Sequence, residues 1–148
     1  MRCVLVDMDG TLSNAAHRQH FVTTKPKNWM AFNHGMVNDP VISHTKELVD
    51  ILIKELAVVI LTARPVEFKD QTVKWLEENK IQFNKIYMRK LKDYRQDFLV
   101  KKDLLDEVRA DGFLPILALD DREPVAKMYR ENGVPCLLVA EAAFEDED

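Results

Sequence analysis

The sequence is poor in glycine and cysteine and has no long apolar run. None of its four glycines has the GxxxxGKS or GxxxxGKT spacing of a phosphate-binding P-loop, so we expect no kinase activity from this chain. No stretch approaches the roughly 18 apolar residues of a transmembrane helix, and the apolar run after Met1 is too short for a signal peptide. The two cysteines, Cys3 and Cys136, lie in short apolar runs that predict buried free thiols. We therefore expect a cytoplasmic protein that does not contact membranes.

Charge is nearly balanced along most of the chain. The formal net charge is −4, and the four acidic residues at positions 145–148 account for all of it. We predict a single domain over residues 1–144 and a disordered acidic tail over residues 145–148. The acidic balance comes from the tail and does not indicate what the domain binds.

Short apolar runs rich in β-branched residues recur along the chain and predict five strands. They alternate with segments of helical spacing, an order typical of the parallel sheet of α/β proteins. Runs such as residues 58–61 lack polar alternation, as expected for strands that helices cover on both faces. We predict a Rossmann-like parallel sheet with helices on both faces, a minimal cap or none, and a loop with one or two short helices over residues 12–38. The predicted strands are residues 2–7, 56–62, 85–89, 115–120 and 136–140.

Two prolines predict where helices begin. Asp39 followed by Pro40 resembles an N-cap and a first helical residue, which predicts a helix over residues 40–55. Pro65 predicts in the same way a helix over residues 65–80.

Polar side chains follow three of the predicted strands at the point where each strand ends. Ligands bind at the carboxyl ends of strands in open parallel sheets, so these side chains should share one crevice if the first, second and fourth strands are neighbours. A lone aspartate at a strand end is usually a cap or turn residue, whereas two pairs after fully apolar strands favour a cation site. Oxygen ligands without cysteine favour Mg²⁺. The residues are Asp7, Asp9, Thr62, Arg64, Asp120 and Asp121.

Lys101 lies on the predicted apolar face of the helix that follows the third strand. It precedes Leu104 and Leu105 by three and four residues, whereas Lys102 falls on the polar face. A buried lysine needs an anionic partner, and Asp97, one turn earlier, is a candidate. The alternatives are a lysine that binds the reacting groups and one that only extends past the helix end.

Four segments resemble, in order, the motifs of the haloacid dehalogenase superfamily of phosphotransferases. Residues 7–11, Asp-Met-Asp-Gly-Thr, match the first motif, Thr62 the second, the Lys101 region the third and the pair Asp120-Asp121 the fourth. Residues 61–64, 95–101 and 119–136 make the chain similar in addition to the 3′-phosphatase domain of phage-type polynucleotide kinase/phosphatase.

The resemblance implies a role for each matching residue. Asp7 would be the nucleophile that forms an aspartyl-phosphate, and Asp9 would be the general acid and base. Asp7, the Asp9 carbonyl and Asp120 would hold Mg²⁺ with Asp121 close by. Thr62 and Lys101 would bind the phosphoryl group. Arg18 falls where the family carries a phosphate-binding arginine, and we expect it to bind substrate together with Arg64 and Asp97.

The implied substrate is a polynucleotide end that carries a 3′-phosphate, and a separate kinase or ligase is a candidate partner. Two alternatives stay open. A nucleotidase would use the same residues on free mononucleotides. A phospho-receiver, a switch that stops at the aspartyl-phosphate, would not be an enzyme, although it would have no use for Asp9.

Two weaker patterns have both a functional and an ordinary interpretation. Residues 85–102 have a local charge of +5, which suits either the flanking phosphates of a substrate or a solvated helix face. Trp29, Phe32 and Tyr94 could stack on nucleobases or belong to the core.

Overall fold

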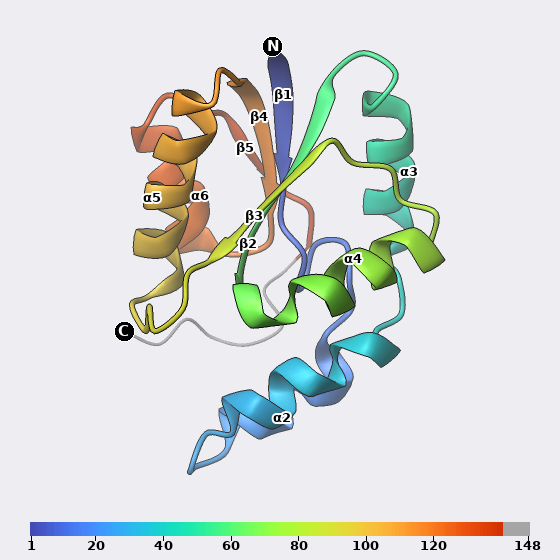
Figure 1. Cartoon of the computed structure of the whole chain (residues 1–148), viewed down its shortest axis with the longest axis vertical. Helices are drawn as coiled ribbons and strands as arrows, with labels where there is room; N and C mark the ends of the chain where they lie inside the picture. The colour runs from blue at the N-terminus through green and yellow to red at the C-terminus, as the bar shows by residue number, and fades with distance from the viewer. Residues whose placement is uncertain (141–148) are drawn as a thin grey trace.

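The computed structural model describes residues 1–140 and shows a five-stranded parallel sheet between two layers of helices (Figure 1). The strand order is β3-β2-β1-β4-β5. The first, second and fourth strands are therefore neighbours at the centre of the sheet. The polar side chains that follow these strands can thus share one crevice, as the sequence predicts. The predicted tail at residues 145–148 lies outside the described residues. The strands are β1 (Arg2–Val6), β2 (Ala57–Pro65), β3 (Lys85–Arg89), β4 (Leu114–Asp120) and β5 (Cys136–Leu138).

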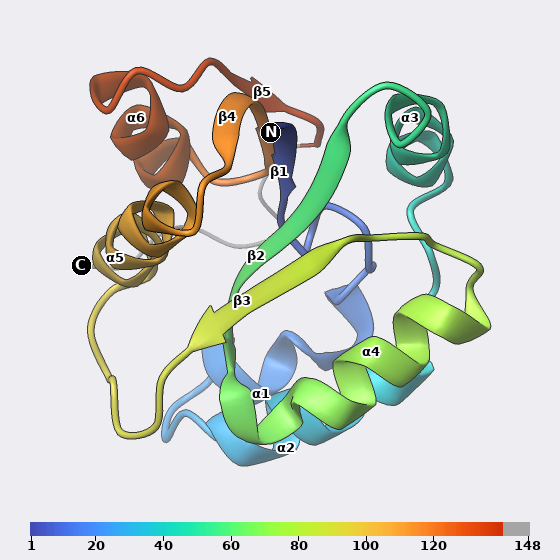
Figure 2. The same ribbon diagram turned by 45° about the horizontal axis from the view of Figure 1, so that its top comes forward.

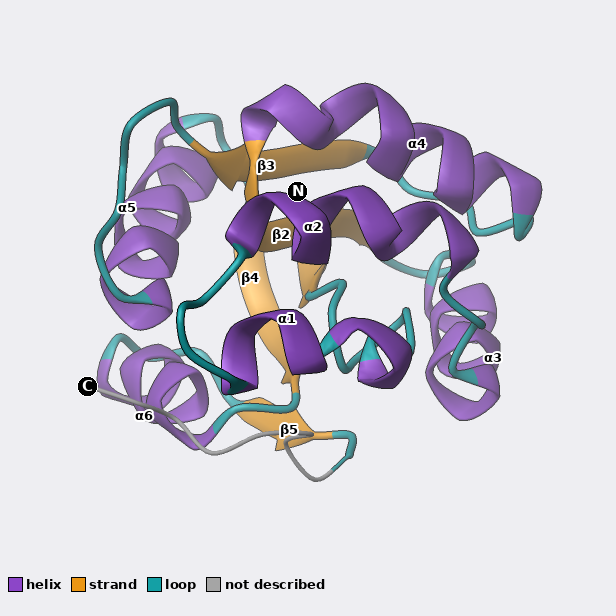
Figure 3. Cartoon of the chain, turned by 90° about the horizontal axis from the view of Figure 1, so that it is seen from below, coloured by secondary structure: helices purple, strands orange, loops and turns teal. Residues whose placement is uncertain are grey.

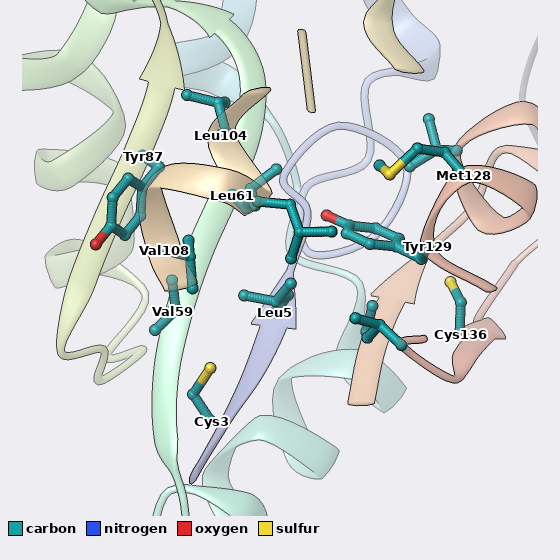
Figure 4. Packing of buried hydrophobic residues seen from close by; sticks show 14 of the residues in the cluster. Cys3, Leu5, Val59, Leu61, Tyr87, Leu104, Val108, Met128, Tyr129 and Cys136 are labelled. Atoms are coloured by element: carbon teal, nitrogen blue, oxygen red, sulfur yellow. The ribbon is translucent and has the colours of Figure 1, made fainter. Parts of the chain in front are cut away.

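Both faces of the sheet are covered, which explains the unbroken apolar runs. Helices α5 (Asp97–Ala110) and α6 (Glu123–Glu131) pack on one face, and α3 (Ser43–Leu52) and α4 (Lys69–Glu78) on the other (Figure 2). Alternate residues of β1 enter different cores, with Leu5 facing α5 and α6 and Val4 facing the opposite layer. Figure 4 shows the ring of Tyr129 from α6 beside Leu5, with Val108 from α5 near Val59.

The two cysteines are buried free thiols, as predicted. Burial raises the pKa of Cys3 to about 11 and that of Cys136 to about 12, so both stay protonated and poorly reactive at neutral pH. Within residues 1–140, no helix is both long and apolar enough to cross a bilayer.

Both proline-based predictions of a helix start are wrong by several residues. Helix α3 begins at Ser43, because the Pro40 carbonyl accepts the Asn14 N–H at 2.8 Å and Val41 forms a bridge with Ser13, so the chain stays extended there. Pro65 ends β2 instead of starting a helix. A 3-10 turn, η3 (Val66–Phe68), then precedes α4.

Residues 16–38 form a small module that we call the helical insert. It consists of η1 (Ala16–Arg18), α1 (His20–Thr23), α2 (Trp29–His34) and η2 (Gly35–Asn38). Figure 3 shows α1 and α2 lying across the carboxyl ends of the strands. Its own small core includes Val22 and Phe32. The insert fits the expected short helices and minimal cap.

Candidate active site

The loop after β1 aims two aspartates at the carboxyl edge of the sheet. The Asp7 N–H donates to the Leu119 carbonyl at 3.1 Å, which ties the start of the loop to β4. Met8 is fully buried, and its carbonyl accepts the N–H groups of Thr11, Leu12 and Ser13. The side chain between the aspartates thus anchors the turn in the core.

Gly10 is required for this turn by both conformation and space. Its φ is +82°, and a Cβ added there would lie 2.0 Å from Asp121 Oδ2. No other side chain can occupy the position without displacing Asp121.

Gly10→Ala should therefore damage both stability and catalysis. We expect a loss of about 1–3 kcal/mol in unfolding free energy and a fall of about 10²-fold in kcat, because Asp121 must move. Gly112→Ala is the matched control: Gly112 has φ +95° with nothing within 4 Å of the added Cβ, so it should lose stability and keep its kcat. Equal kcat values for the two variants, from phosphate release and thermal melts, would contradict this account.

Asp7, Asp120 and Asp121 form a buried cluster that we call the acidic triad. One carboxylate oxygen from each residue lies within 4.8 Å of those from the other two. Lys101 from α5 places its Nζ 3.1 Å from Asp7 Oδ1 and 2.7 Å from Asp120 Oδ2, and only 1% of this lysine is exposed. The second Asp120 oxygen accepts the N–H groups of Asp121 and Arg122. These contacts fix the triad at the ends of β1 and β4.

The electrostatics of the triad suit a hard divalent cation. Burial, together with the charge of Asp120, raises the pKa of Asp7 well above its ordinary value and that of Asp121 to about 7. Asp121 Oδ1 is buried and has no hydrogen-bond partner within residues 1–140. Three carboxylates face one ammonium group, so the ionised triad carries excess negative charge that Mg²⁺ would offset. The donor set therefore fits the metal that the sequence predicts.

Asp121→Asn should stabilise the metal-free protein at alkaline pH. Folding raises the pKa of the Asp121 carboxyl group from about 4 to about 7. The folded protein therefore loses stability as the pH rises through this range, because ionisation of the group is more costly in the folded state. Asparagine cannot ionise, so the melting temperature of the variant minus that of wild type, measured in EDTA, should increase from about pH 5 to about pH 8. Mg²⁺ should raise the melting temperature of wild type more than that of the variant. A difference that shrinks with pH would contradict the assignment.

The carboxylate of Asp9 is not part of the triad and instead binds two arginines, which leaves the Asp9 carbonyl as its expected contribution to the metal site. Arg64 Nη2 donates to Asp9 Oδ1 at 2.7 Å, and Arg18 Nη2 donates to the same oxygen. Both arginines are buried, at 2% and 0% exposure, and their guanidinium groups are committed to protein oxygens. Arg18 and Arg64 thus bind Asp9 directly.

The two arginines set the protonation of Asp9. Burial alone would raise the pKa of Asp9, but the charges of Arg64 and Arg18 and their hydrogen bonds outweigh it and hold the pKa well below its ordinary value. Asp9 is therefore ionised at neutral pH when no ligand is bound.

Asp39, which the sequence pattern assigns to a helix cap, is instead the anchor of Arg18. Its Oδ1 accepts the Arg18 Nε–H at 2.8 Å and lies 2.7 Å from His17 Nε2, and its Oδ2 accepts from Arg18 Nη2 at 2.6 Å. The sequence contains one signal for this role: Asp39 is the only acidic residue between Asp9 and Glu47, and so the only acidic partner in that span for Arg18. A buried arginine in that span required a partner.

Asp97 is not the partner of Lys101. It lies in the first turn of α5 and binds the guanidinium groups of Arg89 and Arg122, at 2.7 Å each. Lys101, one turn later, reaches past it to the triad. Asp97 therefore links the end of β3 to the loop after β4.

Thr62 lies near the carboxyl end of β2, the strand next to β1, and is 1% exposed. Its Oγ1 accepts the Arg64 N–H at 3.1 Å, which leaves the hydroxyl proton available as a donor. A donor at the end of the strand next to β1 can reach an anion bound at the carboxyl edge.

The basic segment at residues 85–102 is mostly neutralised by ion pairs, which favours the ordinary interpretation. Lys90 pairs with Glu107, Arg95 with Asp93 and Asp103, and Lys102 with Asp106. Of the three aromatic residues that could stack on nucleobases or belong to the core, Phe32 is buried, whereas Trp29 and Tyr94 are 51% and 89% exposed.

Comparison with known proteins places the chain in a family. A family model described as the polynucleotide kinase PNKP phosphatase domain matches residues 1–144. A protein described as a bifunctional polynucleotide kinase/RNA ligase of Autographa californica nuclear polyhedrosis virus is 26% identical over 142 residues, which cover 93% of this chain and 19% of that protein.

Solved structures share the fold. A chain of the Pnkp1/Rnl/Hen1 RNA repair complex is 26% identical with a TM-score of 0.79, and the match covers 97% of this chain and 43% of that one. A HAD family enzyme from Bacteroides thetaiotaomicron, solved in complex with magnesium and inorganic phosphate, has a TM-score of 0.56 at 15% identity, with 99% and 96% covered. This chain spans less than half the length of the viral protein and of the repair-complex chain.

Proposed function

The chain belongs to the family of polynucleotide kinase PNKP phosphatase domains, within the HAD hydrolases, and we propose that it is a Mg²⁺-dependent phosphomonoesterase that removes the 3′-phosphate from polynucleotide ends. The observation that carries the chemistry is the position of Asp7, buried against Lys101 and within the acidic triad. The family carries the choice of substrate. Membership of a hydrolase family also favours an enzyme over a phospho-receiver.

Asp7 is the nucleophile in this proposal. One of its carboxylate oxygens attacks phosphorus in line, forms the aspartyl-phosphate bond and breaks the bond to the 3′-oxygen. Lys101 pairs with Asp7 and opposes the rise in its pKa that burial and Asp120 cause, and a bound Mg²⁺ would favour the ionised nucleophile further. The ammonium group also offsets the charge of the arriving phosphoryl group.

Asp9 delivers a proton to the departing 3′-oxygen and later takes one from the water that hydrolyses the aspartyl-phosphate. Arg18 and Arg64 keep it ionised without a ligand, which suits the second step. A dianionic phosphoryl group bound beside Asp9 counteracts the two guanidinium groups and raises its pKa toward the protonated form that the first step needs. The arginines also hold the carboxyl group in one orientation.

Asp7, the Asp9 carbonyl, Asp120 and Asp121 would hold the metal ion. When bound, Mg²⁺ offsets the charge of the nucleophile and of the phosphoryl oxygens. Thr62 donates its free hydroxyl proton to a phosphoryl oxygen. We also propose that a kinase or ligase acts alongside this phosphatase, since one relative is described as a bifunctional polynucleotide kinase/RNA ligase and another belongs to an RNA repair complex.

The proposal is tested with four substrates at equal concentration: one oligonucleotide with a 3′-phosphate, the same one with a 5′-phosphate, and the 3′- and 5′-mononucleotides. We expect Mg²⁺-dependent phosphate release to be fastest from the 3′-phosphorylated oligonucleotide. Cleavage of the mononucleotides alone would assign a nucleotidase and leave the chemistry intact.

A further inference from the structure

Trp29, the first residue of α2, is a large aromatic side chain that the fold leaves half exposed. It is 51% exposed, and its ring meets that of Phe32 edge-on, with 5.6 Å between centroids at 81°. The other tryptophan, Trp75, is 3% exposed and donates its Nε1–H to the Asp39 carbonyl. Burial and hydrogen bonding account for Trp75, whereas nothing in the core requires an indole at position 29.

Contacts connect Trp29 to the proposed acid–base residue. The guanidinium group of Arg18 lies 4.4 Å from the centroid of the Phe32 ring and donates to the Phe32 carbonyl at 3.0 Å. The same guanidinium binds Asp9. Trp29 is thus three successive contacts from Asp9, on the insert that lies across the carboxyl ends of the strands (Figure 3).

The charge of the insert suits a polyanion. From Gly10 to Asn38 the sequence contains no acidic residue. Within this span Arg18 is neutralised by Asp9 and Asp39, and Lys25 is exposed four residues before Trp29. A strand of nucleic acid can therefore approach Trp29 without meeting a like charge on this segment.

The start of α2 is held in place before any ligand arrives. The Asn28 side chain caps the helix by accepting the Ala31 N–H at 3.0 Å, and the Asn28 N–H donates to the Phe21 carbonyl at 2.6 Å. An aromatic ring on a fixed backbone loses little freedom when a base stacks on it.

We propose that Trp29 is a stacking platform for a nucleobase of the 3′-phosphorylated strand. This inference rests on the proposed function and makes the insert a specificity element of that site. Stacking on an indole face is tolerant of sequence, so the platform distinguishes polynucleotide ends from small phosphomonoesters and does not read a particular base.

The test compares Trp29→Ala, Trp29→Phe and wild type on a single-stranded 3′-phosphorylated oligonucleotide and on glycerol phosphate, which has no base. We expect Trp29→Ala to raise KM for the oligonucleotide about tenfold with little change in kcat, and to leave KM for glycerol phosphate unchanged. Trp29→Phe should restore most of the affinity. Leu114→Ala, which removes a side chain 59% exposed at the start of β4, at the opposite edge of the sheet, is the matched control and should match wild type.

A wild-type KM for the oligonucleotide in Trp29→Ala, or an equal rise for both substrates, would overturn the proposal. Failure of the proposed function is a different result, in which wild type itself does not cleave the 3′-phosphorylated oligonucleotide. Fluorescence is a second readout that does not need the alanine variant. The oligonucleotide should quench the emission of Asp7→Asn, and adding Trp29→Phe should abolish the quenching because Trp75 is buried; quenching that persists would contradict stacking at Trp29.

Discussion

Asp7→Asn should abolish phosphate release from every substrate, with a loss of about 10⁴-fold or more in kcat. An amide is a poor nucleophile and cannot form the aspartyl-phosphate. The side chain keeps its shape, and removing a carboxyl group whose pKa is raised by burial and by Asp120 relieves repulsion in the triad. The variant should therefore fold and melt no lower than wild type in EDTA. Phosphate release and a thermal melt on the same preparation measure both effects.

Asp9→Asn should also lose turnover, because the amide can neither donate a proton to the leaving oxygen nor accept one from water. Asp70→Asn, on the exposed side of α4, serves as a control and should behave as wild type. A wild-type rate in either site variant would refute the role assigned to that aspartate.

Lys101→Ala should cause the second large effect and should reduce stability as well as activity. Without the ammonium group, Asp7 and Asp120 are buried without their counter-ion, and loss of one partner of a buried pair costs about 3–5 kcal/mol. The loss should be smaller near pH 5, where the carboxyl groups can be protonated, than near pH 8. Denaturant unfolding at the two pH values, in EDTA, measures it.

Lys102→Ala is the matched control for this experiment. Lys102 is the next residue in α5 and pairs with Asp106 across one turn in an exposed position. Such pairs contribute little, so the variant should stay within about 0.5 kcal/mol of wild type and keep its activity. Similar losses in the two variants would mean that the buried contacts of Lys101 do not matter.

The sheet was predictable because one physical signal determines it. Residues buried on both faces must be apolar without interruption, and runs such as residues 58–61 mark β2 directly. Helix starts were not predictable from proline alone. At residues 39–42 the Asp39 carboxylate binds Arg18 and the Pro40 carbonyl binds Asn14, so tertiary contacts hold the segment extended.

The sequence predicted which residues lie at the carboxyl edge of the sheet. It did not predict which of these side chains bind one another. The positions of Asp7 and Asp120 follow from strand ends. The partners of Asp9, Asp97 and Lys101 depend on how far each side chain reaches across the edge, which periodicity does not encode. Of the two arginines on Asp9, Arg64 comes from β2, whereas Arg18 reaches it because the insert folds back onto the site.

The central claim is that Asp7 forms a covalent phosphoryl intermediate during removal of a 3′-phosphate. The most direct test is the stereochemical course at phosphorus, measured with an oligonucleotide whose 3′-terminal thiophosphate is made chiral with oxygen isotopes. Two successive in-line displacements, first by Asp7 and then by water, predict net retention of configuration in the released thiophosphate. Net inversion would mean a single direct attack by water and would contradict the assigned role of Asp7.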